Sequence, residues 1–358
     1  MHEIFTIQVG QFWEYVCHEH GIDSMGMYHG DSDLQLERIN VYFTEVTQGK
    51  YVPRSAFTDL DEYSVNKIRN SMYRQLFRPD LIVNGNMSAS NNFAKGFFTE
   101  GAEILPELLE KIRQLAEECD VVHGFQFLHS IRGGCGGGLG SLLLDHIRQE
   151  YPDRIIKSYS IVPALSMSQV FIDPYNAVLT MNHLIENADE TFCFDNDALF
   201  EILHRTLRFP PANDTDINQI LAQVMIGVTA CFRFPGQLNM DLRKLAVNMI
   251  PFPALHFLMT SLSPIQTNSY QNLTEQSLCK IAHCDIPPKG LPRSVTGISN
   301  HTGIVQRFDY FLQPFKKLFQ RRAFIHWFID EGMEEIEISE AGNRIDDLIK
   351  QYKSIDNQ

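Results

Sequence analysis

The stretch Val121-Val-His-Gly-Phe-Gln-Phe-Leu-His-Ser-Ile-Arg-Gly-Gly-Cys-Gly-Gly-Gly-Leu-Gly140 decides the fold. Its first part, Val121 to Leu128, is an apolar run that predicts a buried strand. The glycine run Gly133 to Gly138 follows, and apolar residues then recur at helical spacing as far as Ile147. Glycine lets backbone N–H groups face an anion, and a helix N-terminus adds a favourable dipole. The sequence therefore predicts a phosphate-binding loop.

A flexible turn between a strand and a helix is the plain alternative interpretation of this stretch. So many glycines in one turn are costly in chain entropy, which argues against a turn without a function. The loop lacks the Gly-Lys-Ser/Thr of a Walker A motif and the spaced Gly-x-Gly-x-x-Gly that opens a dinucleotide-binding unit. The common nucleotide-binding folds therefore fit it poorly.

The flanking sequence predicts a doubly wound α/β domain with a parallel sheet, because strands alternate with amphipathic helices. Further strands are expected at Leu81 to Val83, Ile155 to Val162 and Thr191 to Phe194. Helices are expected with Pro106 in the first turn of one, and with Asp173 as the cap of another. Further helical patterns surround Ile217 to Val228, Leu242 to Met249, Phe308 to Phe319 and Ile345 to Tyr352.

The composition of the chain indicates which partners and which cellular compartment to expect. The net charge of -14 over 358 residues argues against nucleic acid and anionic membranes as partners, because both attract basic patches. No window approaches the roughly 18 apolar residues of a membrane span, and the N-terminus reads as a short strand. Seven scattered cysteines are typical of reduced thiols. We therefore expect a cytoplasmic protein whose partners are proteins and small ligands.

Two clusters invite a zinc interpretation, namely Cys17-His18-Glu19-His20 and Cys279 with His283-Cys284. A structural zinc site needs four converging ligands, and neither cluster supplies them alone. No Ser/His/Asp or Cys/His arrangement points to nucleophilic catalysis. We therefore predict neither a zinc site nor a catalytic residue of the chain's own.

Several strings resemble the tubulin family, and the resemblance runs nearly end to end. They are Asp31 to Tyr42, Arg78-Pro-Asp80, Thr99 to Glu103, Glu150 to Arg154, Phe234 to Asn239, Leu242 to Met249, Cys284 to Pro288 and Ala323 to Met333. The resemblance implies a tubulin-like α/β fold with a GTPase domain at 1–216, a core helix and truncated intermediate domain at 217–303, and a helical region at 304–358. It also implies GTP and Mg²⁺ as cofactors.

By resemblance, the nucleotide site is made by side chains from several loops. They are Gln11 on the first loop, Asp61 at the Mg²⁺ position, Ser130, Gly134, Cys135 and Gly136 on the phosphate loop, and Asn196 and Asn218 at the guanine edge. Asp61 stands in place of a glutamate, which favours a water-mediated contact with Mg²⁺. Cys135 replaces a threonine, and a thiol is a weaker donor than a hydroxyl.

Other positions of the implied site are less regular. Asp173 matches a ribose-side carboxylate, whereas Gln169 replaces another, and Asp214 stands where an aromatic would stack on the base. Ala89-Ser90-Asn91 matches a loop that senses the γ-phosphate, with serine in place of glycine. Arg132 replaces the first glycine of the family's run, so it either pairs with phosphate or obstructs the loop.

The resemblance is to the β type. Lys244 stands where α-type chains carry the glutamate that positions the attacking water, and a lysine cannot take that part. The implied function is a GTP-binding structural subunit that pairs with α-tubulin in cytoplasmic microtubules. GTP would be hydrolysed only in the polymer, with the acid supplied by an α-type neighbour. An autonomous GTPase is disfavoured for the same reason.

Two gaps relative to tubulins support an alternative function. After Gln11 the chain omits roughly eight residues, about two helical turns. Between Leu273 and Cys279 it omits a stretch of order fifty residues that carries two strands and a helix of the second domain. Losing central strands should expose sheet edges and apolar helix faces. The alternative is a non-polymerising relative with a regulatory or partner-binding role and weak or no GTP binding.

Overall fold

A computed structural model of the chain describes residues 3–7, 12–47, 49–164, 168, 170–206, 214–236, 241–263, 284, 286 and 294–356. For residues 4–7, 206, 214 and 356 it describes the backbone alone. Gln11, Gln169 and the gap between Leu273 and Cys279 therefore lie outside the described residues.

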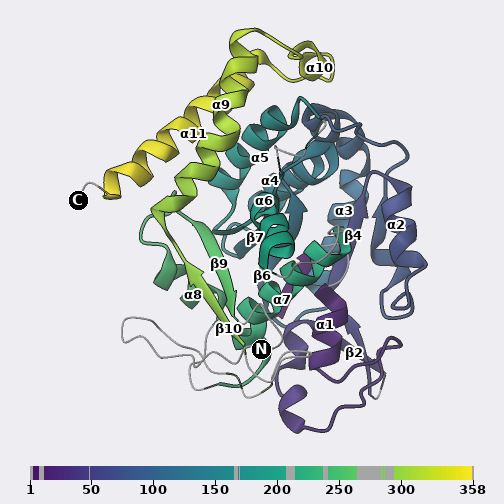
Figure 1. Cartoon of the computed structure of the whole chain (residues 1–358). Helices are drawn as coiled ribbons and strands as arrows, with labels where there is room; N and C mark the ends of the chain where they lie inside the picture. The colour runs from purple at the N-terminus through teal and green to yellow at the C-terminus, as the bar shows by residue number, and fades with distance from the viewer. Residues whose placement is uncertain are drawn as a thin grey trace.

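Eight of the described strands form one sheet in the order β10-β9-β8-β7-β6-β1-β4-β5 (Figure 1). The strands are β1 (Glu3–Ile7), β4 (Ser55–Asp59), β5 (Ile82–Asn84), β6 (Val122–Ser130), β7 (Ile155–Val162), β8 (Glu190–Asp195), β9 (Phe257–Ser263) and β10 (Val295–Ser299). Each neighbouring pair is parallel except β9 and β10, which are antiparallel. Strands β2 (Phe43–Thr47) and β3 (Lys50–Pro53) form a separate hairpin.

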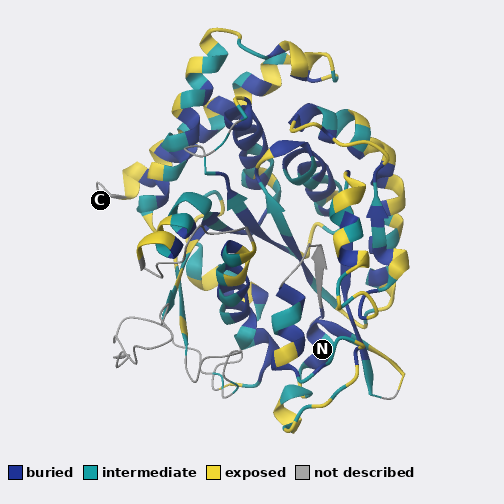
Figure 2. Cartoon of the chain, turned by 45° about the vertical axis from the view of Figure 1, so that its right-hand side comes forward, coloured by how far each residue is buried: buried dark blue, intermediate teal, exposed yellow. Residues whose placement is uncertain are grey.

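Helices cover both faces of this sheet, as its alternating side chains require (Figures 1 and 2). One face packs on α3 (Glu100–Glu117), α4 (Gly140–Glu150) and α5 (Asp173–Asn187), and the other packs on α1 (Phe12–Glu19), α7 (Asp214–Arg233) and α8 (Leu242–Met249). On β7, Ile156 belongs to the first core and Tyr159 to the second. The predicted doubly wound fold is confirmed. In the described part of the chain, no helix is both long and apolar enough to cross a membrane.

Further helices lie around the sheet and the six helices that cover its faces. They are α2 (Glu62–Arg69), α6 (Asn196–Glu201), α9 (Val305–Gln320), α10 (His326–Ile329) and α11 (Glu335–Asp356). Helices α9 and α11 lie side by side and pack on α5 (Figure 1). Strands β9 and β10 extend the sheet of the first 200 residues, with Phe192 of β8 paired to Leu258 of β9. The proposed domain boundaries after residues 216 and 303 stay predictions.

Two helix starts were predicted wrongly. Helix α3 begins at Glu100, so Pro106 lies inside it and not in its first turn. A π-helical turn, Lys95–Thr99, leads directly into α3 and moves its start upstream. Pro106 is tolerated because the carbonyl that loses its helical partner belongs to the exposed Ala102. In α5 the cap is Ile172, and Asp173 is the first helical residue.

Candidate functional site

Most of the sequence-predicted site residues lie at one edge of the sheet, because they follow the carboxyl ends of parallel strands. Asp61 comes after β4, Ser130 and the glycine run end β6, Asp173 follows β7, and Asn196 follows β8. In parallel α/β sheets ligands bind at this edge. Gln11 follows β1, the central neighbour of β4 and β6, but lies outside the described residues.

The glycine run forms a π-helical turn, Gly133–Leu139, which continues into α4. Gly133 has a φ of +75°, in the left-handed region that favours glycine. Backbone N–H groups in the first turn of a helix have no partner within the helix, so this turn presents donors and a positive dipole end. The arrangement suits an anion.

Packing also requires glycine in this turn. A methyl group placed on Gly134 would lie 2.3 Å from the carbonyl oxygen of Asn92, and one on Gly96 would lie 1.8 Å from the carbonyl oxygen of Gly134. A methyl group on Gly136 would lie 2.5 Å from the carbonyl oxygen of Ser130. The run therefore serves two purposes, close contact with the segment before α3 and the presentation of backbone donors.

The Ser130 side chain makes hydrogen bonds at the end of β6, just before this turn. Its hydroxyl oxygen accepts the backbone N–H of Arg132 at 3.2 Å, and its own hydroxyl lies 3.5 Å from the carbonyl oxygen of Ile161 on β7. Ser130 thus connects β6 and β7 where the glycine run begins.

Cys135 faces a pair of carboxylates. Burial raises the pKa of its thiol above the usual range, and Asp59 and Asp61 add to the rise. Asp61 caps α2 by accepting the N–H of Tyr63 at 3.0 Å, and Asp59 accepts the N–H of Asp61 at 3.1 Å. The structure therefore brings the predicted Mg²⁺ residue beside the glycine run. Asp59 was missed, although an acidic residue ending a parallel strand is a usable signal.

The donor set suits Mg²⁺ held partly by water. Mg²⁺ uses one or two carboxylates and completes its octahedral shell with water and phosphate oxygens, so an all-protein cage is not needed. Asp59 and Asp61 supply two such carboxylates. Within the described residues no group of three or more His, Cys, Asp or Glu side chains could hold a metal. Cys17 is buried in the core, Glu19 pairs with Arg233, and His20 stacks on Phe234.

Asp173 and Arg132 form an ion pair across the site, with Nε of Arg132 at 3.0 Å from Oδ2 of Asp173. The Asp173 side chain is fully buried, and the Ser168 hydroxyl donates to the same oxygen. Burial raises the pKa of the Asp173 carboxyl, while the bonds from Ser168 and Arg132 oppose the rise. Oδ1 of Asp173 is buried and has no partner among the described residues. It can accept one hydroxyl.

Asn196 also has a buried amide oxygen without a partner among the described residues. It begins α6, which the Asp195 carboxylate caps by accepting the N–H of Asp197 at 3.1 Å. An unpartnered buried acceptor is costly, which favours a ligand that donates to it. Asn218 is exposed in the early part of α7, and α6 packs against α7. The Asp214 side chain lies outside the description.

The segment Ala89-Ser90-Asn91 lies against the glycine run. Ser90 and Asn91 have φ values of +48° and +61°, which are unusual for residues other than glycine.

On the other side of the sheet, Lys244 is the third residue of α8, whose cap, Asp241, accepts the Lys244 N–H at 2.7 Å. Residues 237–240 of that loop are outside the described residues.

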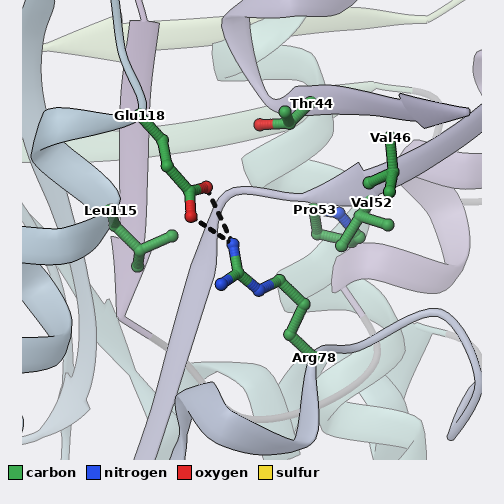
Figure 3. A pocket seen from close by; sticks show the side chains of 7 residues that line it. All are labelled: Thr44, Val46, Val52, Pro53, Arg78, Leu115 and Glu118. Carbon is green, nitrogen blue, oxygen red and sulfur yellow. Dashed lines mark hydrogen bonds and ion pairs between the residues drawn. The ribbon is translucent and has the colours of Figure 1, made fainter.

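A small pocket of about 240 Å³ lies away from this edge (Figure 3). The hairpin β2–β3 and the end of α3 line it, and Arg78 donates to Glu118 at 2.7 Å. Pro53 and Glu118 precede the amino ends of β4 and β6, so this pocket is at the opposite edge of the sheet. It is separate from the predicted site.

The comparison with known families agrees with this geometry. The model described as Tubulin/FtsZ family, GTPase domain, matches residues 3–204. The match spans more than half of the chain and contains the carboxyl ends of β1, β4, β6, β7 and β8, whereas Asn218 and Lys244 lie beyond it.

Proposed function

Because the chain belongs to the Tubulin/FtsZ family, we propose that it is a β-type tubulin subunit that binds GTP and pairs with α-tubulin in cytoplasmic microtubules. The family match makes it a tubulin-like protein of a GTP-binding family. The observation that carries the GTP proposal is the buried amide oxygen of Asn196, which has no partner among the described residues and lies at the same sheet edge as the glycine run. An acceptor there suits the N–H groups of guanine.

The remaining residues have complementary roles in this proposal. The free N–H groups of the turn Gly133–Leu139 bind phosphate oxygens. Asp59 and Asp61 would hold Mg²⁺, which would supply positive charge beside the phosphates. Asp173 accepts a ribose hydroxyl at Oδ1, which has no other partner among the described residues.

Lys244 supports the β-type assignment. It lies on the exposed side of α8 with its ammonium 3.9 Å from the Asp241 carboxylate, and an ammonium cannot accept a hydrogen bond or a proton from the attacking water as a glutamate carboxylate does. Hydrolysis of this chain's GTP would then need an acidic residue from an α-type neighbour in the polymer. Steady GTP turnover by the purified chain alone would contradict this.

Co-expression with an α-type chain tests the proposal. The heterodimer should contain exchangeable guanine nucleotide after purification, and it should pellet with microtubules in a co-sedimentation assay. A complex that neither holds nucleotide nor pellets would overturn the proposal.

A non-polymerising regulatory relative is the second candidate, and the ion pair between Arg132 and Asp173 favours it because it occupies part of the ribose-side carboxylate. This function predicts a heterodimer that stays in the supernatant when microtubules are pelleted. Efficient incorporation into microtubules would exclude it.

A further inference from the structure

Arg132 is the only charged residue between Ser130 and Gly140, and it directly precedes the glycine run. Its backbone N–H is fixed by the Ser130 hydroxyl at 3.2 Å, and it caps the turn Gly133–Leu139 in extended conformation. The backbone of Arg132 is therefore held directly before the first N–H groups of that turn, which have no partner within the helix.

The ion pair with Asp173 fixes the far end of the same side chain. Asp173 is fully buried, and its Oδ2 accepts from both Ser168 and Arg132. Breaking one partner away from a buried carboxylate is expensive, so this contact orients the guanidinium strongly. Arg132 itself is 41% exposed in its side chain, so it is not enclosed by protein.

An arginine has five N–H donors in a planar fork, and Nε supplies only one of them. Nη1 and Nη2 have no ion-pair partner among the described residues, and of these residues only Asp173 has a carboxylate within ion-pair distance of Arg132. Arg132 is the residue directly before the turn whose backbone donors suit an anion. Oδ1 of the buried Asp173 has no partner among the residues that the structure describes, which independently indicates a ligand at this place.

We propose that Arg132 is a phosphate-contacting residue, which keeps Asp173 through Nε and presents Nη1 and Nη2 to the phosphates of a guanosine di- or triphosphate. The inference rests on the proposed function, namely that this edge binds a guanine nucleotide. Arg132 also neutralises the Asp173 carboxylate, which would otherwise repel the phosphates. With Oδ2 already taken by two donors, Asp173 is left with Oδ1 for a single ribose hydroxyl.

This assignment makes binding depend on phosphate. Charge-assisted bonds from a guanidinium are about twice as strong as neutral ones, and their loss should weaken ligands that carry phosphates. A nucleoside without phosphate lacks the group that Arg132 contacts, so its affinity should not respond.

Equilibrium binding of GTP, GDP and guanosine to the purified full-length chain tests the proposal. Arg132→Gln should weaken GTP and GDP binding by about tenfold or more, and guanosine binding by less than about twofold. Arg132→Lys keeps the positive charge but loses the planar set of guanidinium donors, so it should weaken GDP binding less than Arg132→Gln does. Arg321→Gln, at an exposed position after α9, is the matched control and should change nothing.

The outcomes separate the two claims. If the wild-type chain binds GTP and GDP and Arg132→Gln binds them equally well or more tightly, Arg132 is no phosphate ligand and only this inference fails. Tighter binding by Arg132→Gly would show that the side chain obstructs the loop. If neither the wild type nor any variant binds guanine nucleotide, the proposed function fails as well. Thermal unfolding of each nucleotide-free variant checks that it is folded. If Arg132→Gln does not fold, the binding measurements on Arg132→Lys test the proposal instead.

Discussion

The side-chain amide of Asn176 donates a hydrogen bond to the backbone carbonyl oxygen of Asn91 over 2.7 Å. The amide oxygen of Asn176 accepts the N–H of Phe93 at 3.1 Å. One buried side chain on α5 thus holds both sides of the segment in which Ser90 and Asn91 have positive φ values. Such backbone conformations cost about 1 kcal/mol or more each and persist only where the surroundings enforce them.

Asn176→Ala should therefore destabilise the chain and loosen this segment. Both bonds are lost and buried backbone groups of Asn91 and Phe93 lose their partner, so the free energy of unfolding should fall by about 1 to 3 kcal/mol. Urea denaturation measures this change. Asn70→Ala, at an exposed position after α2, is the control and should shift the midpoint little. Equal stability of the wild type and Asn176→Ala would show that the loop holds its own conformation.

The glycine run allows a comparison between neighbouring positions. A methyl group on Gly134 would lie 2.3 Å from the backbone of Asn92, whereas the nearest atom to one on Gly140 would be in the His129 side chain, 3.2 Å away. Gly134→Ala should lower the free energy of unfolding by about 1 to 3 kcal/mol, as overpacking does. Gly140→Ala should be neutral or stabilising by up to about 1 kcal/mol, because alanine favours helix. Thermal unfolding without nucleotide distinguishes them, and equal effects would contradict the packing role of Gly134.

The sequence predicted the structure best where a pattern within one short segment determined the bounds of an element. Strand β7 has the predicted bounds, Ile155–Val162, and most of its residues are buried, as expected of a parallel strand that is covered on both faces. The start of α5 was predicted wrongly, since Asp173 turns toward Ser168 and Arg132 and leaves the capping position to Ile172. Local capping preference could not anticipate those long-range partners.

Tertiary contacts account for what the sequence did not reveal about the site. Asn176 is one of three asparagines in α5, so nothing nearby in the sequence distinguishes it as the residue that supports Asn91. The two possible roles of Arg132 could not be separated because Asp173 lies on a different βα connection. The purpose of Gly134 in packing depends on Asn92, which the sheet brings beside it.

Asn196 should show opposite effects on stability and on binding. Its buried amide oxygen lacks a partner among the described residues, so Asn196→Ala removes an unsatisfied acceptor and should raise the free energy of unfolding without nucleotide by about 1 kcal/mol. The same change should weaken GTP binding by about tenfold, because guanine loses an acceptor. Urea denaturation and equilibrium binding measure the two effects. A loss of stability without loss of affinity would place Asn196 in a structural role.

Lys157 of β7 and Glu190 of β8 form an ion pair with both side chains fully buried, 3.6 Å between Nζ and Oε2. The Lys157 ammonium also lies 4.5 Å from the ring centre of Phe192. Lys157→Met should destabilise the chain by about 3 to 5 kcal/mol because Glu190 loses its partner, whereas replacing both residues, with Glu190→Leu added, should cost much less. A double-mutant cycle in urea measures the coupling. Additive losses would show that the pair contributes no coupling energy.

The same pair predicts how stability depends on pH. Burial raises the pKa of Glu190 to about 7, from an ordinary value of 4.5, although Lys157 opposes the rise. Because the folded chain holds this proton more tightly than the unfolded chain, Glu190 adds stability below pH 4.5 that is lost as pH rises through about 7. The loss should be about 3 kcal/mol at most. The glutamine of Glu190→Gln cannot titrate. Between pH 5 and pH 7.5 the free energy of unfolding of the wild type should therefore fall by up to about 3 kcal/mol more than that of Glu190→Gln. Parallel pH profiles for the wild type and Glu190→Gln would mean that Glu190 keeps its ordinary pKa in the fold.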